Sequence, residues 1–187
     1  MEKNIALIAL FAALIAALGM IPKITLGFGV PITAQSMGVM LCGTVLGARR
    51  GGMAVLLFLL LVALGLPLLA GGRGGLGVFA SPTVGFLVGW PIAAFVTGLI
   101  VEHWRRAPLA LVAGLASAVG GIAVMYFFGT VGLSIMLDKS LTEAALLITA
   151  FIPGDILKAA IAGMLTAALA KARPASVLSR STRADAL

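Results

Sequence analysis

The sequence predicts an all-α integral membrane protein with six transmembrane helices and both termini in the cytoplasm. Hydrophobic residues make up 61% of its 187 positions and charged residues only 10%, whereas a typical soluble domain has about 25% charged residues. The apolar residues also lie in long unbroken runs, which is typical of helices in lipid. Residues 1–187 are therefore predicted to form one transmembrane domain.

Six runs are long enough to cross a bilayer, because about 20 mostly apolar residues span about 30 Å of hydrocarbon. The first run follows Lys3 as in a signal peptide, but it is longer than the roughly 7–15 apolar residues of a signal core. The glycines of the fifth run, from Gly120 to Gly132, leave its path open. The predicted spans are residues 5–22, 32–48, 52–70, 82–101, 108–136 and 146–170, with a frayed cytoplasmic tail at 174–187.

The distribution of positive charge predicts the orientation, because cytoplasmic loops of membrane proteins are enriched in Lys and Arg. With the N-terminus inside, nine cations lie in the cytoplasm and three outside, and Lys158 lies within a span. The inner cations are Lys3, Arg49, Arg50, Arg105, Arg106, Lys171, Arg173, Arg180 and Arg183, and the outer ones are Lys23, Arg73 and Lys139. The net charge of +7 is thus explained by topology, and no basic stripe predicts nucleic acid as a partner.

The outer side carries the irregular sequence. Residues 23–35 and 65–75 contain Gly and Pro at positions where a helix would otherwise continue. Irregular backbone at membrane depth is tolerated only where it is buried in protein or lines a cavity. These two segments are therefore expected either to be buried in protein or to line a cavity.

Asp155 and Lys158 are the two charged residues of the sixth predicted span, where placing a charge in lipid costs free energy. They are three residues apart, so they share one helix face, and each costs about 2.5–3.5 kcal/mol at the centre of a membrane helix. Pro153 suits the first turn of a helix, whose N-terminus favours an ionised carboxylate. A self-neutralising ion pair is the simpler interpretation. We favour a binding site, in which the pair offers a donor and an acceptor to a urea or amide.

Four other polar features are ambiguous. Arg73, between two pairs of glycines, is either a solvated loop charge or a bidentate clamp for a carboxylate. Thr33 and Gln35 either bind a ligand or serve, respectively, as a helix cap and an interfacial residue. Tyr126 begins an aromatic run that either lines a site or packs.

Ala9, Ala13 and Ala17 are spaced four residues apart in the first span. Stripes of small residues let helices approach closely. The contact is made either within this protein or with another membrane protein.

No motif for enzyme chemistry, cofactor binding or metal binding is present. The sequence contains neither a GxxxxGK[ST] nucleotide loop nor an HExxH zinc motif. Cys42 lies in an apolar run, and His103 lies in a cytoplasmic loop without a second ligand nearby. We therefore predict a binding protein, not an enzyme, that has no cofactor of its own and leaves ATP hydrolysis to other chains.

Five segments, in the same order and over nearly the whole chain, resemble the BioY family, the biotin-binding S components of energy-coupling factor (ECF) transporters. These segments are residues 30–35, 65–75, 81–89, 126–129 and 153–158. The resemblance implies a six-helix S-component fold with a vitamin site near the outer face, covered by the loop between the first two spans. It also implies uptake of biotin across the bacterial cytoplasmic membrane.

The resemblance assigns roles to the candidate residues. Asp155 and Lys158 would hold the ureido ring of biotin, and Arg73 would bind the valerate carboxylate. The remaining lining residues would be Thr33, Gln35 and Tyr126. The implied partners, besides the lipid bilayer, are a transmembrane coupling protein (EcfT) and two cytoplasmic ABC-type ATPases, with the alanine stripe as the docking surface.

Two alternatives stay open at this stage. An ion-gradient-coupled carrier would use Asp155 and Lys158 as a protonation relay, and its uptake would collapse with the gradient. An S component for another vitamin would share the fold and would differ only in its ligand.

Overall fold

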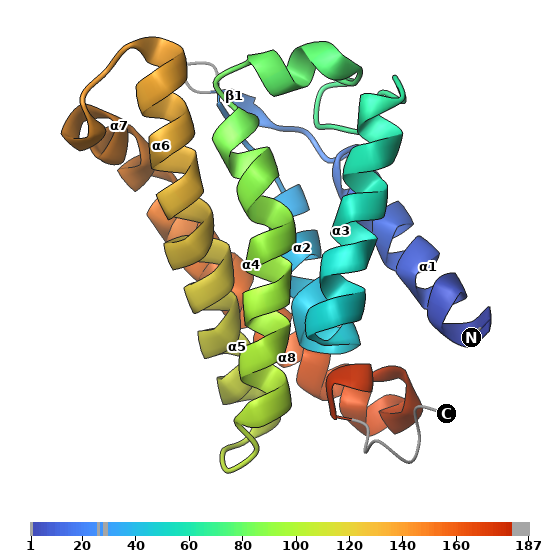
Figure 1. Cartoon of the computed structure of the whole chain (residues 1–187). Helices are drawn as coiled ribbons and strands as arrows, with labels where there is room; N and C mark the ends of the chain where they lie inside the picture. Colours follow the sequence, from blue (N-terminus) through green and yellow to red (C-terminus); the bar gives the residue numbers. More distant parts are fainter. Residues whose placement is uncertain (1, 26, 28–29, 181–187) are drawn as a thin grey trace.

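The computed structural model describes residues 2–25, 27 and 30–180, and within these residues the chain is nearly all helical. Six helical segments follow one another, which confirms the predicted six-helix fold (Figure 1). The segments are α1 (Glu2–Leu18), α2 (Gln35–Leu46), α3 (Ala48–Ala63), α4 (Val84–His103), α5 (Leu109–Ala118) continued by the π-helix η2 (Val119–Val124) and α6 (Met125–Leu137), and α7 (Leu141–Ile148) continued by the 3-10 turn η3 (Thr149–Phe151) and α8 (Ile152–Ala172).

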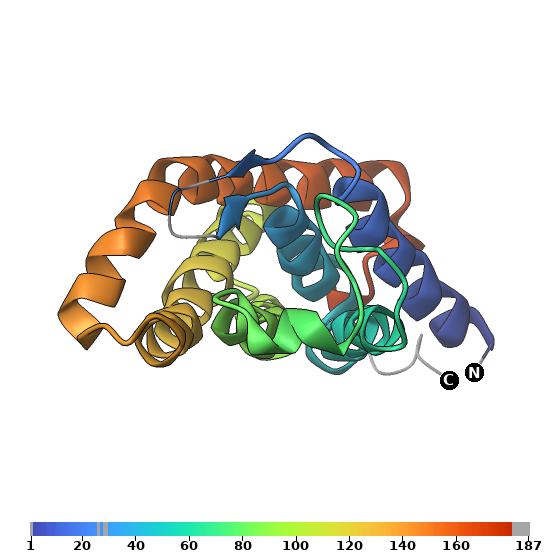
Figure 2. The same cartoon turned by 90° about the horizontal axis from the view of Figure 1, so that it is seen from above.

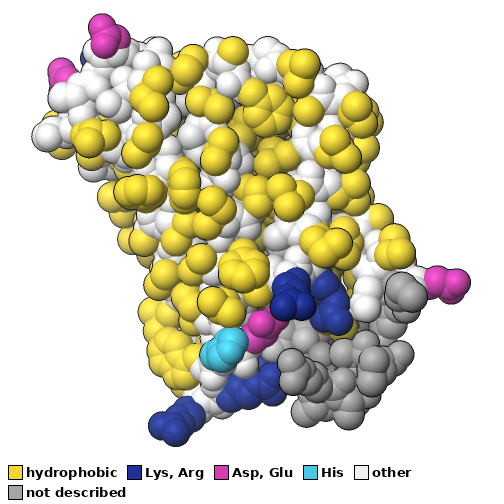
Figure 3. Space-filling model, in the orientation of Figure 1, with side chains coloured by type: hydrophobic (Ala, Val, Ile, Leu, Met, Phe, Trp, Pro, Cys, Tyr) yellow, Lys and Arg dark blue, Asp and Glu magenta, His cyan; other side chains and the backbone are white. Residues whose placement is uncertain are grey.

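The helices bury one face against each other and expose apolar side chains on the other. Helix α4 packs against α2, α3 and α6, α5 packs against α8, and α1 covers α2 and α3. The visible face of the molecule is covered by hydrophobic side chains, and charged groups gather at the ends (Figure 3). The segments 84–103, 109–137 and 141–172 are each long and apolar enough to cross a membrane. Such an apolar exterior is typical of a protein whose solvent is lipid.

The two ends of the bundle differ. One end, here called the hairpin end, carries the antiparallel strands β1 (Ile24–Thr25) and β2 (Pro31–Ile32) and the loop at 64–83, which includes the 3-10 turn η1 (Leu76–Ala80). Seen from above, the segment with β1 and β2 lies over the helices beside α8 and α2 (Figure 2). The other end, here called the basic end, carries Arg49 and Arg50 at the start of α3 and the loop at 105–108 after α4.

Several helices begin or end away from the predicted boundaries, where glycine and proline change the backbone. Helix α3 begins at Ala48, four residues early, because Gly47 adopts φ +85° and turns the chain directly from α2 into α3. It ends at Ala63, where Gly65 adopts φ +106° and Pro67 follows. The sixth segment starts early at Leu141, where Ser140 and Glu143 form a reciprocal capping box.

The expected frayed tail is wrong for residues 174–180. These residues form two 3-10 turns, η4 (Pro174–Ser176) and η5 (Leu178–Arg180), with Val177 and Ser179 each only 1% exposed. The hydroxyl of Ser179 donates to the carbonyl of Thr44 at 2.5 Å. The segment therefore covers the basic end of α2, and residues 181–187 of the predicted tail lie outside the described part of the chain.

Helices α4 and α6 meet backbone to backbone at Gly85 and Gly132. A Cβ built on Gly132 would lie 2.5 Å from the Cα of Gly85, so neither position has room for a side chain. This contact fixes the relative positions of two helices that border the cavity described below.

We expect Gly132→Leu to lower the Tm of the purified protein by roughly 5–10 °C, because overpacking costs about 1–3 kcal/mol in a domain of this size. Thermal unfolding in detergent, followed by size-exclusion chromatography, measures this shift. Gly114→Ala is the matched control, since its Cβ would meet only the carbonyl of Ala159 at an ordinary 3.7 Å. An equal Tm for the two variants would contradict this account of the contact.

Candidate functional site

A cavity opens at the hairpin end among α2, α4, α6, α8 and the two irregular segments. The space left free of atoms is about 540 Å³, counting its open mouth. Five of the six predicted site residues line it: Thr33, Gln35, Arg73, Asp155 and Lys158. Most of the other lining side chains are apolar, so the cavity combines an apolar wall with a few polar groups.

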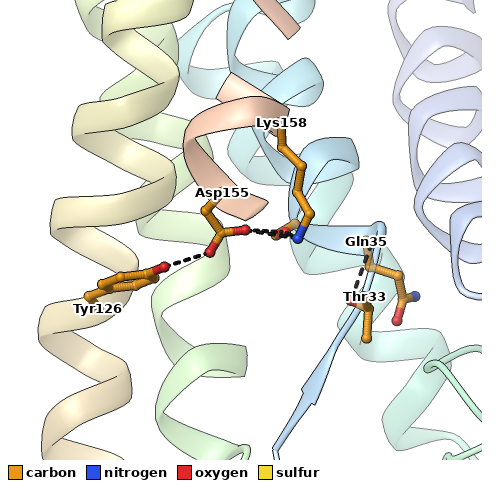
Figure 4. Close-up of polar contacts among 6 residues, drawn as sticks. Thr33, Gln35, Tyr126, Asp155 and Lys158 are labelled. Atoms are coloured by element: carbon orange, nitrogen blue, oxygen red, sulfur yellow. Dashed lines mark hydrogen bonds and ion pairs between the residues drawn. The ribbon is translucent and has the colours of Figure 1, made fainter. Parts of the chain in front are cut away.

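Asp155 and Lys158 form the polar centre of the cavity (Figure 4). Lys158 Nζ lies 2.8 Å from Asp155 Oδ1 and 3.0 Å from Ser36 Oγ, and the Ser36 hydroxyl donates to the same Oδ1 at 3.3 Å. The phenol of Tyr126 donates to Asp155 Oδ2 at 2.8 Å. The side chains of Asp155 and Lys158 are 7% and 16% exposed, respectively, so water contributes little to stabilising their charges.

The hydrogen bonds to this pair leave unused capacity. A carboxylate offers about four lone-pair positions, and Asp155 accepts from Lys158, Ser36 and Tyr126. An ammonium offers three donors, and Lys158 uses two within the described part of the chain. One acceptor position on Asp155 and one donor on Lys158 therefore remain for a ligand. Together they complement a ligand group that contains both N–H and C=O.

Local helix structure explains where these groups lie. Asp155 is in the first turn of α8, which has Pro153 near its start, and the positive end of the helix dipole favours the charged carboxylate. Tyr126 is the second residue of α6, which continues directly from the π-helix η2. One extra residue in a helix rotates everything after it by roughly 100°, and this rotation sets the side of α6 from which Tyr126 faces Asp155. Tyr126 thus supports Asp155 from behind and is not among the residues that line the cavity.

Arg73 is held at the cavity by a tight turn. Leu69 and Arg73 pair through their backbones, with Leu69 N–H donating at 3.0 Å and Arg73 N–H at 3.2 Å. Gly71 and Gly72 adopt φ +80° and +69°, which glycine allows without strain. Arg73 Nε is buried and has no hydrogen-bond partner among the described residues, and burial lowers the pKa of its guanidinium. A cation in this state favours binding of an anion.

Gln35 has a structural role that the sequence did not reveal. Its amide nitrogen donates to the carbonyls of Ile15 at 3.1 Å and Leu68 at 3.0 Å, and its oxygen accepts from the N–H of Ala70 at 2.9 Å. The side chain is 1% exposed and points away from Lys158 (Figure 4). Gln35 therefore joins α1, α2 and the loop of Arg73, and little of its hydrogen-bonding capacity is left for a ligand.

Thr33 lies at the cavity, and the N-cap position of α2 belongs to Ala34 and not, as expected, to Thr33. Its hydroxyl accepts from the N–H of Gln35, the first residue of α2, at 3.3 Å, and the residue also lines the cavity. Its side chain both supports the helix start and borders the cavity.

The aromatic wall comes from residues other than the predicted run. Phe86 and Trp90 of α4 and Phe151 of η3 line the cavity, and the rings of Phe86 and Phe151 pack edge to face with centroids 5.9 Å apart. Phe127, in the predicted run, is 65% exposed on the outer surface. Trp90 both packs on Phe58 and borders the cavity.

Ser36 was missed by the sequence reasoning, although it contacts both members of the ion pair. In the sequence, Ser36 is a small polar residue at the start of an apolar run, and nothing near it in the chain indicates a contact with a charged group. The available signal was its position directly after Gln35, which continues the polar stretch begun by Thr33.

The three alanines of the predicted docking stripe lie on the surface. Ala9, Ala13 and Ala17 are exposed along α1, whereas Ala12 and Ile15 of the same helix are buried. The alanine stripe thus faces outward and is not the contact between α1 and the rest of the bundle.

Comparison with known proteins agrees with this fold. The family model described as "BioY family" matches residues 2–175. The "Biotin transporter BioY" of Rhodobacter capsulatus is 54% identical over 96% of this chain and all of its own length, and that of Rhizobium etli is 54% identical over 87% and 90%. The solved S component for biotin from an ECF-type ABC transporter superimposes with a TM-score of 0.86 at 31% identity, covering 91% of this chain and 92% of that one. This chain therefore belongs to the BioY family.

Proposed function

We propose that this protein is the biotin-binding S component of an ECF-type vitamin uptake transporter. The observation that carries the proposal is the ion pair of Asp155 and Lys158, whose spare acceptor and donor match the N–H and C=O of a cyclic urea. Biotin also has an apolar ring body and a carboxylate tail. These suit the aromatic wall and the guanidinium of Arg73, whose Nε has no hydrogen-bond partner among the described residues. The names of the relatives support the same ligand.

The family is one of transporters, so the protein is not an enzyme. We further propose that it needs no cofactor of its own, because the cavity chemistry requires only binding.

The hairpin end is proposed to face outward, with both termini in the cytoplasm. The basic end gathers Arg49, Arg50 and the arginines of the 105–108 loop (Figure 3), and cytoplasmic ends of membrane proteins carry this excess of positive charge. The location would then be the bacterial cytoplasmic membrane, with the cavity open to the exterior. Biotin would be captured from outside.

The proposed partners are a transmembrane coupling protein of the EcfT type and two ABC-type ATPases. A binding subunit whose sequence shows no nucleotide-binding motif needs energy from another chain. The exposed alanine stripe on α1, formed by Ala9, Ala13 and Ala17, suits close packing of a partner helix.

We expect Ala13→Trp to reduce recovery of the coupling protein at least 10-fold in co-purification and to leave biotin affinity unchanged, because an indole would hold the two helices apart. Ile135→Trp is the control, since Ile135 is also exposed, at 73%, but lies on α6 and not on the helix of the alanine stripe. Equal recovery with the two variants, or loss of biotin binding in Ala13→Trp alone, would sink this assignment.

The proposed function predicts tight binding of labelled biotin to the purified protein in detergent, without ATP or an ion gradient. Equilibrium dialysis measures it, with desthiobiotin and an unrelated vitamin as competitors. Desthiobiotin, which keeps the urea and the carboxylate, should compete, and the unrelated vitamin should not. Absence of binding by folded protein would reject biotin as the ligand, and uptake that depends on a proton or sodium gradient would favour a carrier that uses Asp155 and Lys158 as a relay.

A further inference from the structure

A second hollow lies on the side of the molecule between α3 and α4, away from the cavity. We call it the α3–α4 groove. Its free space is about 720 Å³, counting the open side, and its walls are almost entirely apolar. They are formed by Gly52, Met53 and Leu56 of α3 and by Pro91, Ile92 and Phe95 of α4.

The groove exists because one residue in its floor, Gly52, lacks bulk. Gly52 has no side chain, and a Cβ at this position would lie 3.6 Å from the carbonyl oxygen of Pro91, in ordinary contact. The walls rise on either side from Met53 and Leu56, which are 54% and 56% exposed, and from Phe95, which is 41% exposed. The result is an open apolar groove on the surface of the helices.

Arg49 closes the groove at the basic end. It precedes Gly52 by three residues and Leu56 by seven, so all three share one face of α3. Among the described residues Arg49 forms no ion pair, since the one salt bridge there joins Asp155 and Lys158. The nearby carboxylate of Glu102 accepts from the N–H of Ala48 instead. Among the described residues, Arg49 thus offers a positive charge that no ion pair neutralises, at one end of an apolar groove.

The dimensions match one lipid chain. Seven residues of α-helix separate Arg49 from Leu56, a rise of roughly 10 Å, and one leaflet of the hydrocarbon core is about 15 Å deep. A chain that runs along the groove from a headgroup at Arg49 would therefore stay within one leaflet. Complementarity of charge then selects an anionic headgroup.

We propose that the α3–α4 groove binds one acyl chain of an anionic phospholipid and that Arg49 binds the headgroup phosphate. The inference rests on the membrane location of the protein and not on biotin as its ligand. A partner helix or a second copy of this chain would fill the same groove without needing an anionic lipid.

Native mass spectrometry of the detergent-purified protein tests this proposal, with phosphatidylglycerol and phosphatidylcholine of identical acyl chains as probes. We expect the wild type to retain one phosphatidylglycerol with at least 5-fold preference. Arg49→Gln should abolish the preference, and Gly52→Leu should weaken binding of both lipids by filling the floor of the groove. Arg50→Gln is the matched control, because Arg50 is adjacent but does not line the groove.

Equal binding of the two lipids by the wild type, or equal losses in Arg49→Gln and Arg50→Gln, would overturn the proposal. So would a dimer that Gly52→Leu dissociates, because it would identify a second copy as the occupant. The comparison of the two arginines decides the question even if Gly52→Leu does not fold. Biotin binding measured on the same samples should stay unchanged in both arginine variants, so failure of this inference is distinct from failure of the proposed function.

Discussion

Asp155→Asn is expected to weaken biotin binding by about 100-fold or more. The change removes the charge that holds Lys158 and the acceptor proposed for the ureido N–H, and charge-assisted hydrogen bonds contribute about 1.5–3 kcal/mol each. Lys158→Met should have a similar effect, because it removes the donor proposed for the ureido C=O. Titration calorimetry of the purified variants with biotin measures both losses.

Loss of folding must be separated from loss of binding, because breaking a buried pair leaves one charge uncompensated. The double variant Asp155→Asn with Lys158→Met removes both charges, so its Tm should be at least as high as that of either single variant. It should nevertheless fail to bind biotin. If either single variant or the double variant bound biotin with wild-type affinity, the ion pair would not be the ureido site.

Arg73→Gln is expected to weaken biotin binding at least 50-fold and to change the affinity for neutral biotin amide less than 3-fold. The reason is that Arg73 has a buried, unpartnered Nε and borders the cavity, where it is proposed to bind the carboxylate alone. Competition of each ligand against labelled biotin measures the two effects separately.

The matched control for Arg73→Gln is Lys139→Gln, which removes an exposed cation from the same end of the protein, in the turn between α6 and α7. It should leave both affinities unchanged. Equal losses for biotin and its amide in Arg73→Gln would show that Arg73 supports the loop structure and does not bind the carboxylate.

Long apolar runs predicted the six-helix fold, because a lipid environment requires little beyond length and hydropathy. The predicted helix boundaries were less accurate where the backbone conformation of a single residue begins or ends a helix. The positive φ at Gly47 joined α2 to α3 four residues earlier than the apolar pattern indicated. The buried hydroxyl of Ser179 ordered a polar segment that its composition alone placed in a frayed tail.

The ion pair could be found from sequence because charge inside a membrane is costly and its spacing on a helix is informative. Residues that act through contacts between distant segments could not be found from the sequence. The bonds of Ser36 to Asp155 and Lys158 span more than a hundred positions, and the aromatic wall joins Phe86 to Phe151. Tyr126 was predicted to line the site, whereas in the structure its hydroxyl donates to Asp155 and the residue is not among those that line the cavity.

The amide of Gln35 ties the end of α1 to the loop that holds Arg73. Helix α1 also carries the alanine stripe, so the proposed partner surface and the proposed carboxylate site share one rigid connection. Any partner that shifts α1 must then alter biotin affinity, and thermodynamic linkage requires biotin to alter partner affinity by the same factor. The loaded and empty forms of the protein would thus differ in their tendency to assemble, and the hydrogen bonds of Gln35 would link the two surfaces.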